Sequence, residues 1–212
     1  LQNDPRRKSI RLTTLNTDAI TTATVTHQLT RTSTLSMYID MKSPVLLQTA
    51  TATVYSADRP DDTTVIRLIL DSGSQRSYIT SKLRDSLRLP RKQSQTVSIK
   101  TFGSQVERVE TCDIVELKFK ARMGADFELS LFTVPNICEP LSGQPINWAV
   151  ERFPYLQGLD LADSCDSRDA LEMSILVGMD QYWKVATGGI LRGKSGPTAM
   201  ETKLGWVLSG PV

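Results

Sequence analysis

One short run, Asp71-Ser72-Gly73, combines residue types that could do acid/base chemistry. It directly follows the apolar segment 65–70, which predicts a buried strand. Such a strand would hold the Asp71 carboxylate rigidly, Ser72 could donate a hydrogen bond inside the turn, and Gly73 would let the backbone turn tightly. This order fits one half of a site in which two carboxylates share the acid/base work. For the tripeptide alone, a strand-ending turn without chemistry is an equally good interpretation.

The composition leaves few other kinds of catalyst. His27 is the single histidine and lies in a Thr-rich stretch, where we interpret it as a solvated residue. A serine or cysteine nucleophile activated by histidine would have to use it, and a zinc site with several histidine ligands is excluded. Cys112, Cys138 and Cys165 lack the close spacing of a zinc site and are interpreted as buried or inert thiols. We therefore expect carboxylate chemistry, with no metal and no cofactor.

Length, charge and cysteine content limit the remaining classes of function. The 212 residues fit one domain with a tail, and a net charge of +2 predicts no nucleic-acid surface on the folded domain. The basic residues 6–8 are interpreted as a solvated charge run, although they leave nucleic-acid binding by the N-terminal segment as an alternative. No apolar run could span a membrane, and the sparse cysteines fit a reducing compartment, so an intracellular, cytoplasmic protein is expected. The start at Leu1 indicates a segment of a longer chain.

The elements that must position Asp71 are mostly short strands. Residues 1–40 are rich in Thr and predict a flexible linker, followed by a folded domain over 41–212. Ile79, Leu83 and Leu87 are spaced four apart and predict a short helix that ends at Pro90. The expected strands are 45–55, 65–70, 111–121, 127–134, 175–178, 190–192 and 204–209, with a polar turn at 57–64, a hairpin at 96–109 and a loop containing Gly196 and Pro197.

Residues 136–172 interrupt this rhythm of strands. Prolines and glycines punctuate the segment, a short helix is expected over 146–153, and the acidic stretch 160–169 predicts an exposed loop. The segment could cover the site, join a subunit contact or lie on the surface, and the residue pattern does not choose among these. We expect Trp148, Trp183 and Trp206 to pack in a core.

Four segments carry a resemblance to a known family: VLLQTATATVYS, LILDSGSQRSYIT, SILVGMDQYWKVATGGILRG and TKLGWVLSG. A strand ending in Asp-Ser-Gly, a hairpin with a glycine at its tip and a later apolar strand ending in Gly178 resemble, in this order, the retropepsin-like aspartic proteases. The segments are more specifically similar to the aspartic peptidase domain of Pao/BEL-type retrotransposon polyproteins, over about residues 41–212. Short retroviral proteases usually carry Gly-Arg after the apolar strand, whereas this chain has Gly178-Met179.

The resemblance implies a mainly β, retropepsin-like closed barrel or sandwich, with one or two short helices and 136–172 as an insertion. It implies a role for each matching residue: Asp71 as the catalytic carboxylate, Ser72 as the hydroxyl that grips the opposite catalytic loop, Gly73 at the turn, Ser74 lining or bracing the site, Gly178 packed beneath the loop, and Phe102, Gly103 and Ser104 as the tip of a flap. The implied activity is endopeptidase cleavage of the chain's own polyprotein.

The second carboxylate has no counterpart in the sequence. Asp85-Ser86 and Asp166-Ser167 lack the following glycine, and Asp180 is interpreted as the cap of a helix over 181–186. We therefore expect a homodimer with a two-fold axis, in which another copy supplies a second Asp71. A catalytically inactive retropepsin-like module for dimerisation or binding is the alternative.

Overall fold

The structure is a computed structural model that describes residues 44–99, 108–163 and 171–212, and these belong to a single compact unit, Thr32–Val212. Several sequence-based expectations fall outside the described residues: the linker at 1–40 with His27 and the basic run, the flap tip at Phe102, Gly103 and Ser104, and Cys165. No helix of the described part has the length and apolar character to cross a membrane.

The described chain is mainly β, which confirms the predicted fold class. The strands are β1 (Val45–Leu46), β2 (Thr49–Ser56), β3 (Arg59–Leu70), β4 (Tyr78–Thr80), β5 (Gln93–Ile99), β6 (Arg108–Phe119), β7 (Phe127–Val134), β8 (Ile175–Val177), β9 (Ala186–Arg192), β10 (Thr198–Thr202) and β11 (Gly205–Pro211). The helices are α1 (Ser81–Ser86), α2 (Ile146–Arg152), the 3-10 turn η1 (Pro154–Leu156) and α3 (Met179–Val185).

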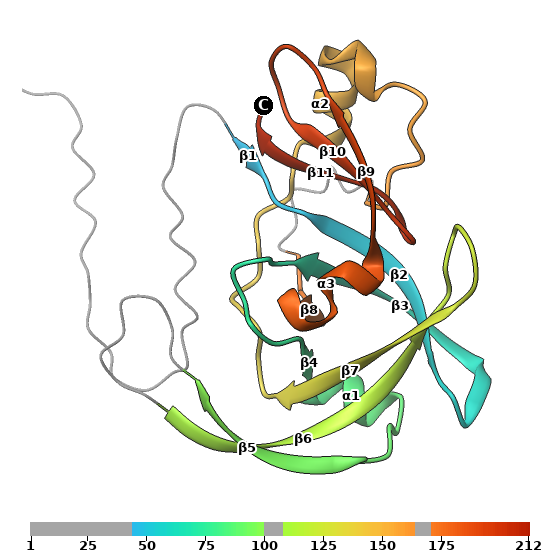
Figure 1. The fold of residues 1–212 in the computed structure, drawn as a ribbon, viewed down its shortest axis with the longest axis vertical. Helices are drawn as coiled ribbons and strands as arrows, with labels where there is room; N and C mark the ends of the chain where they lie inside the picture. Colours follow the sequence, from blue (N-terminus) through green and yellow to red (C-terminus); the bar gives the residue numbers. More distant parts are fainter. Residues whose placement is uncertain (1–43, 100–107, 164–170) are drawn as a thin grey trace, which may run out of the picture. The chain divides into compact units, whose positions relative to one another are not determined.

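Seven strands form the larger sheet, in the order β2-β3-β8-β4-β7-β6-β5. Strand β2 also pairs with β6, at Val54 opposite Phe119 and Tyr55 opposite Lys118. This pairing makes the sheet curve back on itself as a barrel, and the strands wrap around a common interior in Figure 1. Strand β5 comes last in this order and pairs with β6.

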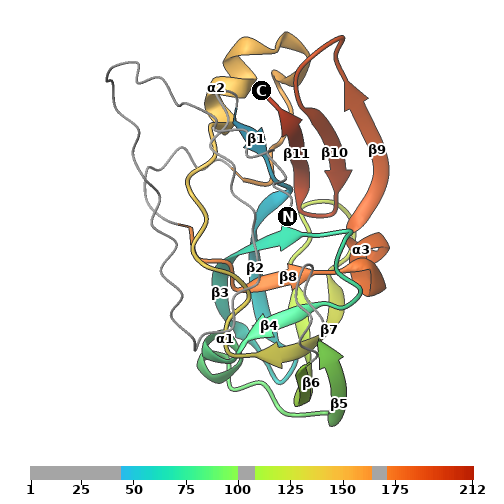
Figure 2. The same cartoon turned by 90° about the vertical axis from the view of Figure 1, so that its left-hand side faces the viewer.

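Strand β8 is inserted between two strands that are close together in the sequence. It runs parallel to β3, with Leu70 opposite Val177, and antiparallel to β4, with Ile79 opposite Ile175. Figure 2 shows β8 lying between β3 and β4, with α3 following at its end. Its apolar sequence suits this place, because a central strand is covered on both faces. The arrangement brings the end of β8 against the turn that follows β3.

The barrel interior is filled by alternating apolar residues of the strands. Val54, Leu68, Leu117, Leu129 and Ile175 are all fully buried in one cluster. Burial of each such side chain stabilises the fold by about 1.5–3 kcal/mol relative to exposure. The strands that carry the Asp71 turn and its neighbours therefore belong to the most rigid part of the protein.

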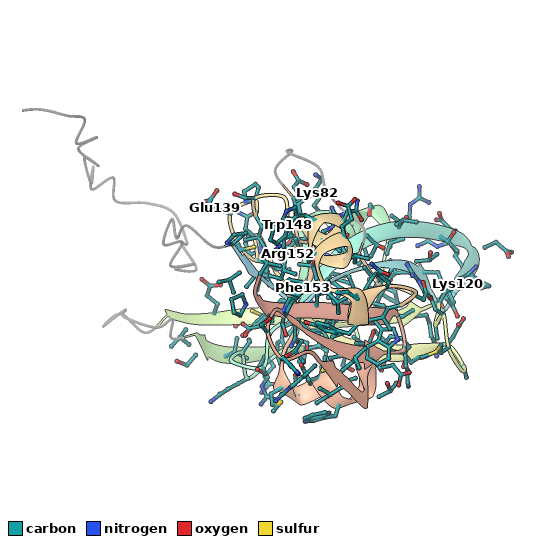
Figure 3. The ribbon with its side chains drawn as sticks, turned by 90° about the horizontal axis from the view of Figure 1, so that it is seen from above. Lys82, Lys120, Glu139, Trp148, Arg152 and Phe153 are labelled. Carbon is teal, nitrogen blue, oxygen red and sulfur yellow. The ribbon has the colours of Figure 1, made fainter. Side chains whose placement is uncertain are left out.

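A second, four-stranded sheet has the order β1-β11-β10-β9. Ala149 of α2 and Leu156 of η1 pack on it in a separate core with Leu46, Ala199 and Leu208. From sequence, residues 136–172 could cover the site, join a subunit contact or lie on the surface. The structure shows that they include α2 and η1, which cover this second sheet. Figure 3 shows Trp148, Arg152 and Phe153 along this part of the chain, and the Arg152 guanidinium lies 5.7 Å from the centre of the Trp148 ring.

Several predicted elements need correction. The polar turn predicted at 57–64 is limited to residues 57–58, because β3 begins at Arg59. Pro60 is accommodated where the pairing with β2 is irregular, between Arg59 and Thr63. The loop at Gly196 and Pro197 is shorter than expected, because β10 begins at Thr198.

The predicted burial was also wrong at particular side chains. Trp148 and Trp183 are 46% and 65% exposed rather than packed in a core, while Trp206 is half-buried in the core beneath α2. The acidic stretch 160–169 was predicted to be an exposed loop, but in its described part, residues 160–163, Asp163 is buried and paired with Arg67 of β3. The first half of β3, with the sequence RPDDTT, was missed because its proline and charged residues are typical of loops.

Candidate active site

Asp71 follows the last residue of β3 and is fixed by the strand beside it. Its backbone N–H donates to the carbonyl oxygen of Val177 in β8 at 2.9 Å, and Leu70 donates to Gln48 at 2.8 Å. The backbone that carries the carboxylate is thus hydrogen-bonded to the chain on both sides of β3. The last residue of β3, Leu70, is buried, whereas Asp71 is only half-buried, so the acid group stands at the end of an interior strand of the sheet.

The Asp-Ser-Gly turn organises its own carboxylate. The Gly73 N–H donates to Asp71 Oδ1 at 2.9 Å, and the Ser74 N–H donates to the Asp71 carbonyl at 3.2 Å. Ser74 Oγ donates to the Arg76 carbonyl at 2.9 Å, so this hydroxyl braces the turn. Ser72 and Gly73 are exposed at its tip, where a second surface could reach them.

Gly178 lies directly against the far side of the same loop. A β-carbon at this position would overlap the Arg76 carbonyl group and would stand 2.9 Å from the Ser74 carbonyl oxygen. Real β-carbons do not approach so closely, so only glycine allows this packing. The next residue, Met179, donates its N–H to the Ser74 carbonyl at 2.8 Å.

Two further polar residues, Ser77 and Asp180, also join the loop to the junction of β8 and α3. Their sequence pattern did not indicate that they belong to the site. Ser77 is fully buried, and its Oγ accepts from the Gly178 N–H at 2.9 Å and donates to Asp180 Oδ1 at 2.7 Å. Asp180 is therefore not the helix cap that its sequence position indicated. Gly178 is the N-cap of α3, and Asp180 lies inside the first turn, where its carboxylate binds Ser77.

Tyr78, which follows the Asp71 loop, packs in one core with Cys112 and Cys138. Burial raises the pKa of the Tyr78 phenol above its ordinary value, and the nearby Cys112 and Asp180 add to the effect. Burial also raises the pKa values of the Cys112 and Cys138 thiols. These thiols stay protonated at neutral pH, which makes them poor nucleophiles.

Eight residues were predicted for the site; five of them lie together in the structure, and the other three are not among the described residues. Asp71, Ser72, Gly73, Ser74 and Gly178 form one continuous loop-and-strand contact, whereas Phe102, Gly103 and Ser104 lie outside the described residues. The described arms β5 and β6 are paired from Gln93 opposite Ile114 to Ile99 opposite Arg108, as expected of a long hairpin. Within the described ranges no cluster of three histidine, cysteine or acidic residues has a metal-binding arrangement.

Comparison with known protein families gives a match over most of the folded chain. Residues 53–211 match the family described as "Putative peptidase (DUF1758)". The match extends from β2 to β11 and includes the Asp71 turn, Ser77, Gly178 and Asp180. No curated protein and no solved structure matches the chain.

Proposed function

Because the chain belongs to this peptidase family, DUF1758, we propose that it is an aspartic endopeptidase in which Asp71 residues from two copies activate one water molecule. The observation that carries the proposal is the Asp71 turn itself. A half-buried acid residue stands at the end of β3, with its Oδ1 held by the Gly73 N–H at 2.9 Å and its backbone N–H held by the Val177 carbonyl at 2.9 Å. This is a preorganised acid/base group, which catalysis of amide hydrolysis needs.

The second carboxylate is proposed to come from another copy of the chain. The other Asp-Ser pair in the described residues, Asp85-Ser86, lies at the end of α1, where Asp85 forms an ion pair with Arg84 at 2.7 Å. Asp180 already accepts the Ser77 hydroxyl at 2.7 Å. Neither carboxylate lies in a turn at the end of a strand, as the Asp71 carboxylate does. A two-fold axis passing beside the exposed Ser72 and Gly73 would set two Asp71 carboxylates facing each other.

The chemistry follows from placing two carboxylates about 3 Å apart, because at that distance they cannot both ionise easily and they share one proton. The ionised carboxylate takes a proton from water, and the water oxygen attacks the peptide carbonyl carbon. The protonated carboxyl donates a hydrogen bond to the carbonyl oxygen and so stabilises the tetrahedral intermediate. A proton then passes to the leaving nitrogen as the C–N bond breaks.

The remaining residues of the turn fit supporting roles. In the dimer, the exposed Ser72 hydroxyl would donate to the backbone of the partner's loop, and Ser74 would keep its own loop folded through the Arg76 carbonyl. The hairpin formed by β5 and β6 would close over an extended substrate. The resemblance to retrotransposon peptidase domains supports the further proposal that the substrate is the chain's own polyprotein, cleaved inside the cell.

A peptide-library digest with the wild type and the Asp71→Asn variant tests this function. Asparagine keeps the shape of the side chain but cannot exchange a proton, so cleavage should fall to background, and a hydroxyl-bearing transition-state analogue should inhibit the wild type. Asp85→Asn removes a carboxylate from a matching Asp-Ser pair and should cleave normally. Equal cleavage by the wild type and Asp71→Asn would refute the proposal, and absence of cleavage by a dimeric wild type would favour the non-catalytic module.

A further inference from the structure

The Asp71 loop is attached to three consecutive residues at the junction of β8 and α3. The Val177 carbonyl accepts from the Asp71 N–H at 2.9 Å, the Gly178 N–H donates to Ser77 Oγ at 2.9 Å, and the Met179 N–H donates to the Ser74 carbonyl at 2.8 Å. Two of these bonds join backbone to backbone and use no side chain. The bond at Gly178 depends on the Ser77 side chain alone.

The Ser77 hydroxyl has a fixed direction because of Asp180. A serine hydroxyl carries one proton and can accept two hydrogen bonds. Its proton is committed to Asp180 Oδ1 at 2.7 Å, which leaves a lone pair of Oγ facing the Gly178 N–H. The carboxylate acceptor strengthens the first bond and, through polarisation of the hydroxyl, the second.

Ser77 is also the end point of the loop. Its carbonyl accepts from the Phe132 N–H of β7 at 2.9 Å, and its side chain is fully buried. The loop is therefore anchored at Asp71 by β8 and at Ser77 by both β7 and β8. Loss of the hydroxyl would leave the Gly178 N–H buried without its partner. The backbone bond of Ser77 to Phe132 would remain, but the side-chain bond to Gly178 would be gone, so that the loop could shift relative to β8.

We propose that Ser77 and Asp180 are a positioning pair that holds the Asp71 loop in register with β8, so that two Asp71 carboxylates meet at the correct separation. This inference rests on the function proposed above. Neither residue touches the water or the substrate; each acts through the position of Asp71. Because amide hydrolysis by the carboxylate pair depends on their separation, a displacement of the loop should lower kcat while binding of the peptide changes little.

The test compares Ser77→Ala, Asp180→Ala and the double variant on a fluorogenic peptide that carries the sequence most strongly cleaved in the library digest. Each single variant should lower kcat about 10- to 100-fold with KM changed less than about 3-fold, since a misplaced catalytic group loses rate rather than affinity. The double variant should lose no more than the worse single variant, because the two residues form one unit. Independent, multiplicative losses would overturn the pairing.

Conservative variants separate positioning from general stability. Asp180→Asn keeps an oxygen that can accept from Ser77, and Ser77→Thr keeps the hydroxyl, so both should retain most of the kcat lost in the alanine variants. Glu172→Gln removes a carboxylate whose side chain is 73% exposed and should leave kcat unchanged. If the conservative variants lose as much kcat as the alanine variants while the melting temperature is unchanged, the proposed hydrogen bonds do not position the loop.

Amide hydrogen exchange gives a readout that does not depend on activity. The N–H groups of Gly178 and Met179 should exchange faster in Ser77→Ala and Asp180→Ala than in the wild type, while the N–H of Leu129 in the barrel keeps its protection. If Asp71→Asn still cleaves, the proposed function fails, and this exchange pattern alone decides whether the pair holds the loop. If Asp71→Asn is inactive but the Ser77 and Asp180 variants keep full kcat and normal exchange, only the present inference fails.

Discussion

Gly178 packs so closely on Arg76 that a β-carbon at position 178 would overlap the Arg76 carbonyl group. We expect Gly178→Ala to destabilise the protein by about 1–3 kcal/mol, because the well-packed loop must move to admit one methyl group. The same movement should lower kcat by at least about 10-fold, since it displaces the Asp71 turn. Urea unfolding and peptide cleavage measure the two effects on one preparation.

Gly188→Ala is the matched control for this prediction. Gly188 has a φ of 96°, which strains any residue with a β-carbon, but apart from its two chain neighbours no residue lies within 4 Å of the position that the β-carbon would take. The control should therefore lose stability while keeping kcat. A Gly178→Ala variant with normal kcat would show that the contact with Arg76 does not set the position of Asp71.

The ion pair of Arg67 with Asp163 joins the strand that carries Asp71 to the inserted segment. Two hydrogen bonds of 3.0 and 3.1 Å connect the guanidinium to the carboxylate, whose side chain is 2% exposed. Asp163→Ala should lower the free energy of unfolding by about 3 kcal/mol, because it leaves a largely buried arginine without its main counter-charge. Chemical denaturation measures the change.

An exposed pair provides the comparison for this ion pair. Lys82 and Glu172 are 3.1 Å apart, with side chains 82% and 73% exposed, so Glu172→Ala should cost less than about 0.5 kcal/mol. In the double variant Arg67→Met, Asp163→Ala, the loss should be smaller than the sum of the two single losses. Additive losses would mean that the two residues stabilise the fold separately.

The local residue pattern was enough to predict each part of the site that comes from a single continuous segment of the chain. The apolar run before Asp71 and the apolar run before Gly178 predicted the second half of β3 and β8. In β3 this run is buried on one face, at Ile66, Leu68 and Leu70, while Val65 is exposed. The four-residue spacing of Ile79, Leu83 and Leu87 predicted α1, which the structure shows as Ser81–Ser86. Each of these patterns lies within a few neighbouring residues, so it can be recognised without knowledge of the tertiary structure.

The links between distant segments could not be predicted. Ser77 and Asp180 are 103 positions apart, and each alone has an ordinary local explanation, a turn residue and a helix cap. Asp163 is an acidic residue in an acidic stretch, and only the fold shows that Arg67 faces it. Hydrogen bonds and ion pairs of this kind depend on which strands become neighbours, and periodicity carries no information about that.

The Tyr55–Asp126 hydrogen bond should make a small part of the stability depend on pH. Tyr55 Oη donates to Asp126 Oδ2 at 2.8 Å, and the Ala121 N–H donates to Oδ1 at 3.1 Å. These bonds lower the pKa of Asp126 below its ordinary 3.8, with the Tyr55 bond as the larger cause. A lowered pKa in the folded state means that the unfolded state binds more protons, so this stability is present above pH 3.8 and is lost as the pH falls below the folded-state pKa.

Tyr55→Phe removes the larger cause and tests this dependence. The variant should be less stable than the wild type at neutral pH, and the difference should shrink as the pH is lowered through 3.8 and below, as followed by urea titration at each pH. Because the Tyr55 hydroxyl carries no charge, added salt should change little the difference in stability between the variant and the wild type. A difference that is constant from neutral to acid pH would show that Tyr55 stabilises the fold without acting on the ionisation of Asp126.

Activity should require two intact copies of Asp71 at once. When the wild type and Asp71→Asn are mixed in equal amounts at constant total protein and allowed to exchange subunits, random pairing leaves about one quarter of the dimers with two carboxylates. Specific activity should then fall to about one quarter of the wild-type value, whereas independent monomers would keep about one half. Before subunit exchange the mixture should also show about one half, so the time course is its own control. Activity that stays at one half after exchange, or that is unchanged on dilution far below the dimer dissociation constant, would place the second acid group within a single chain.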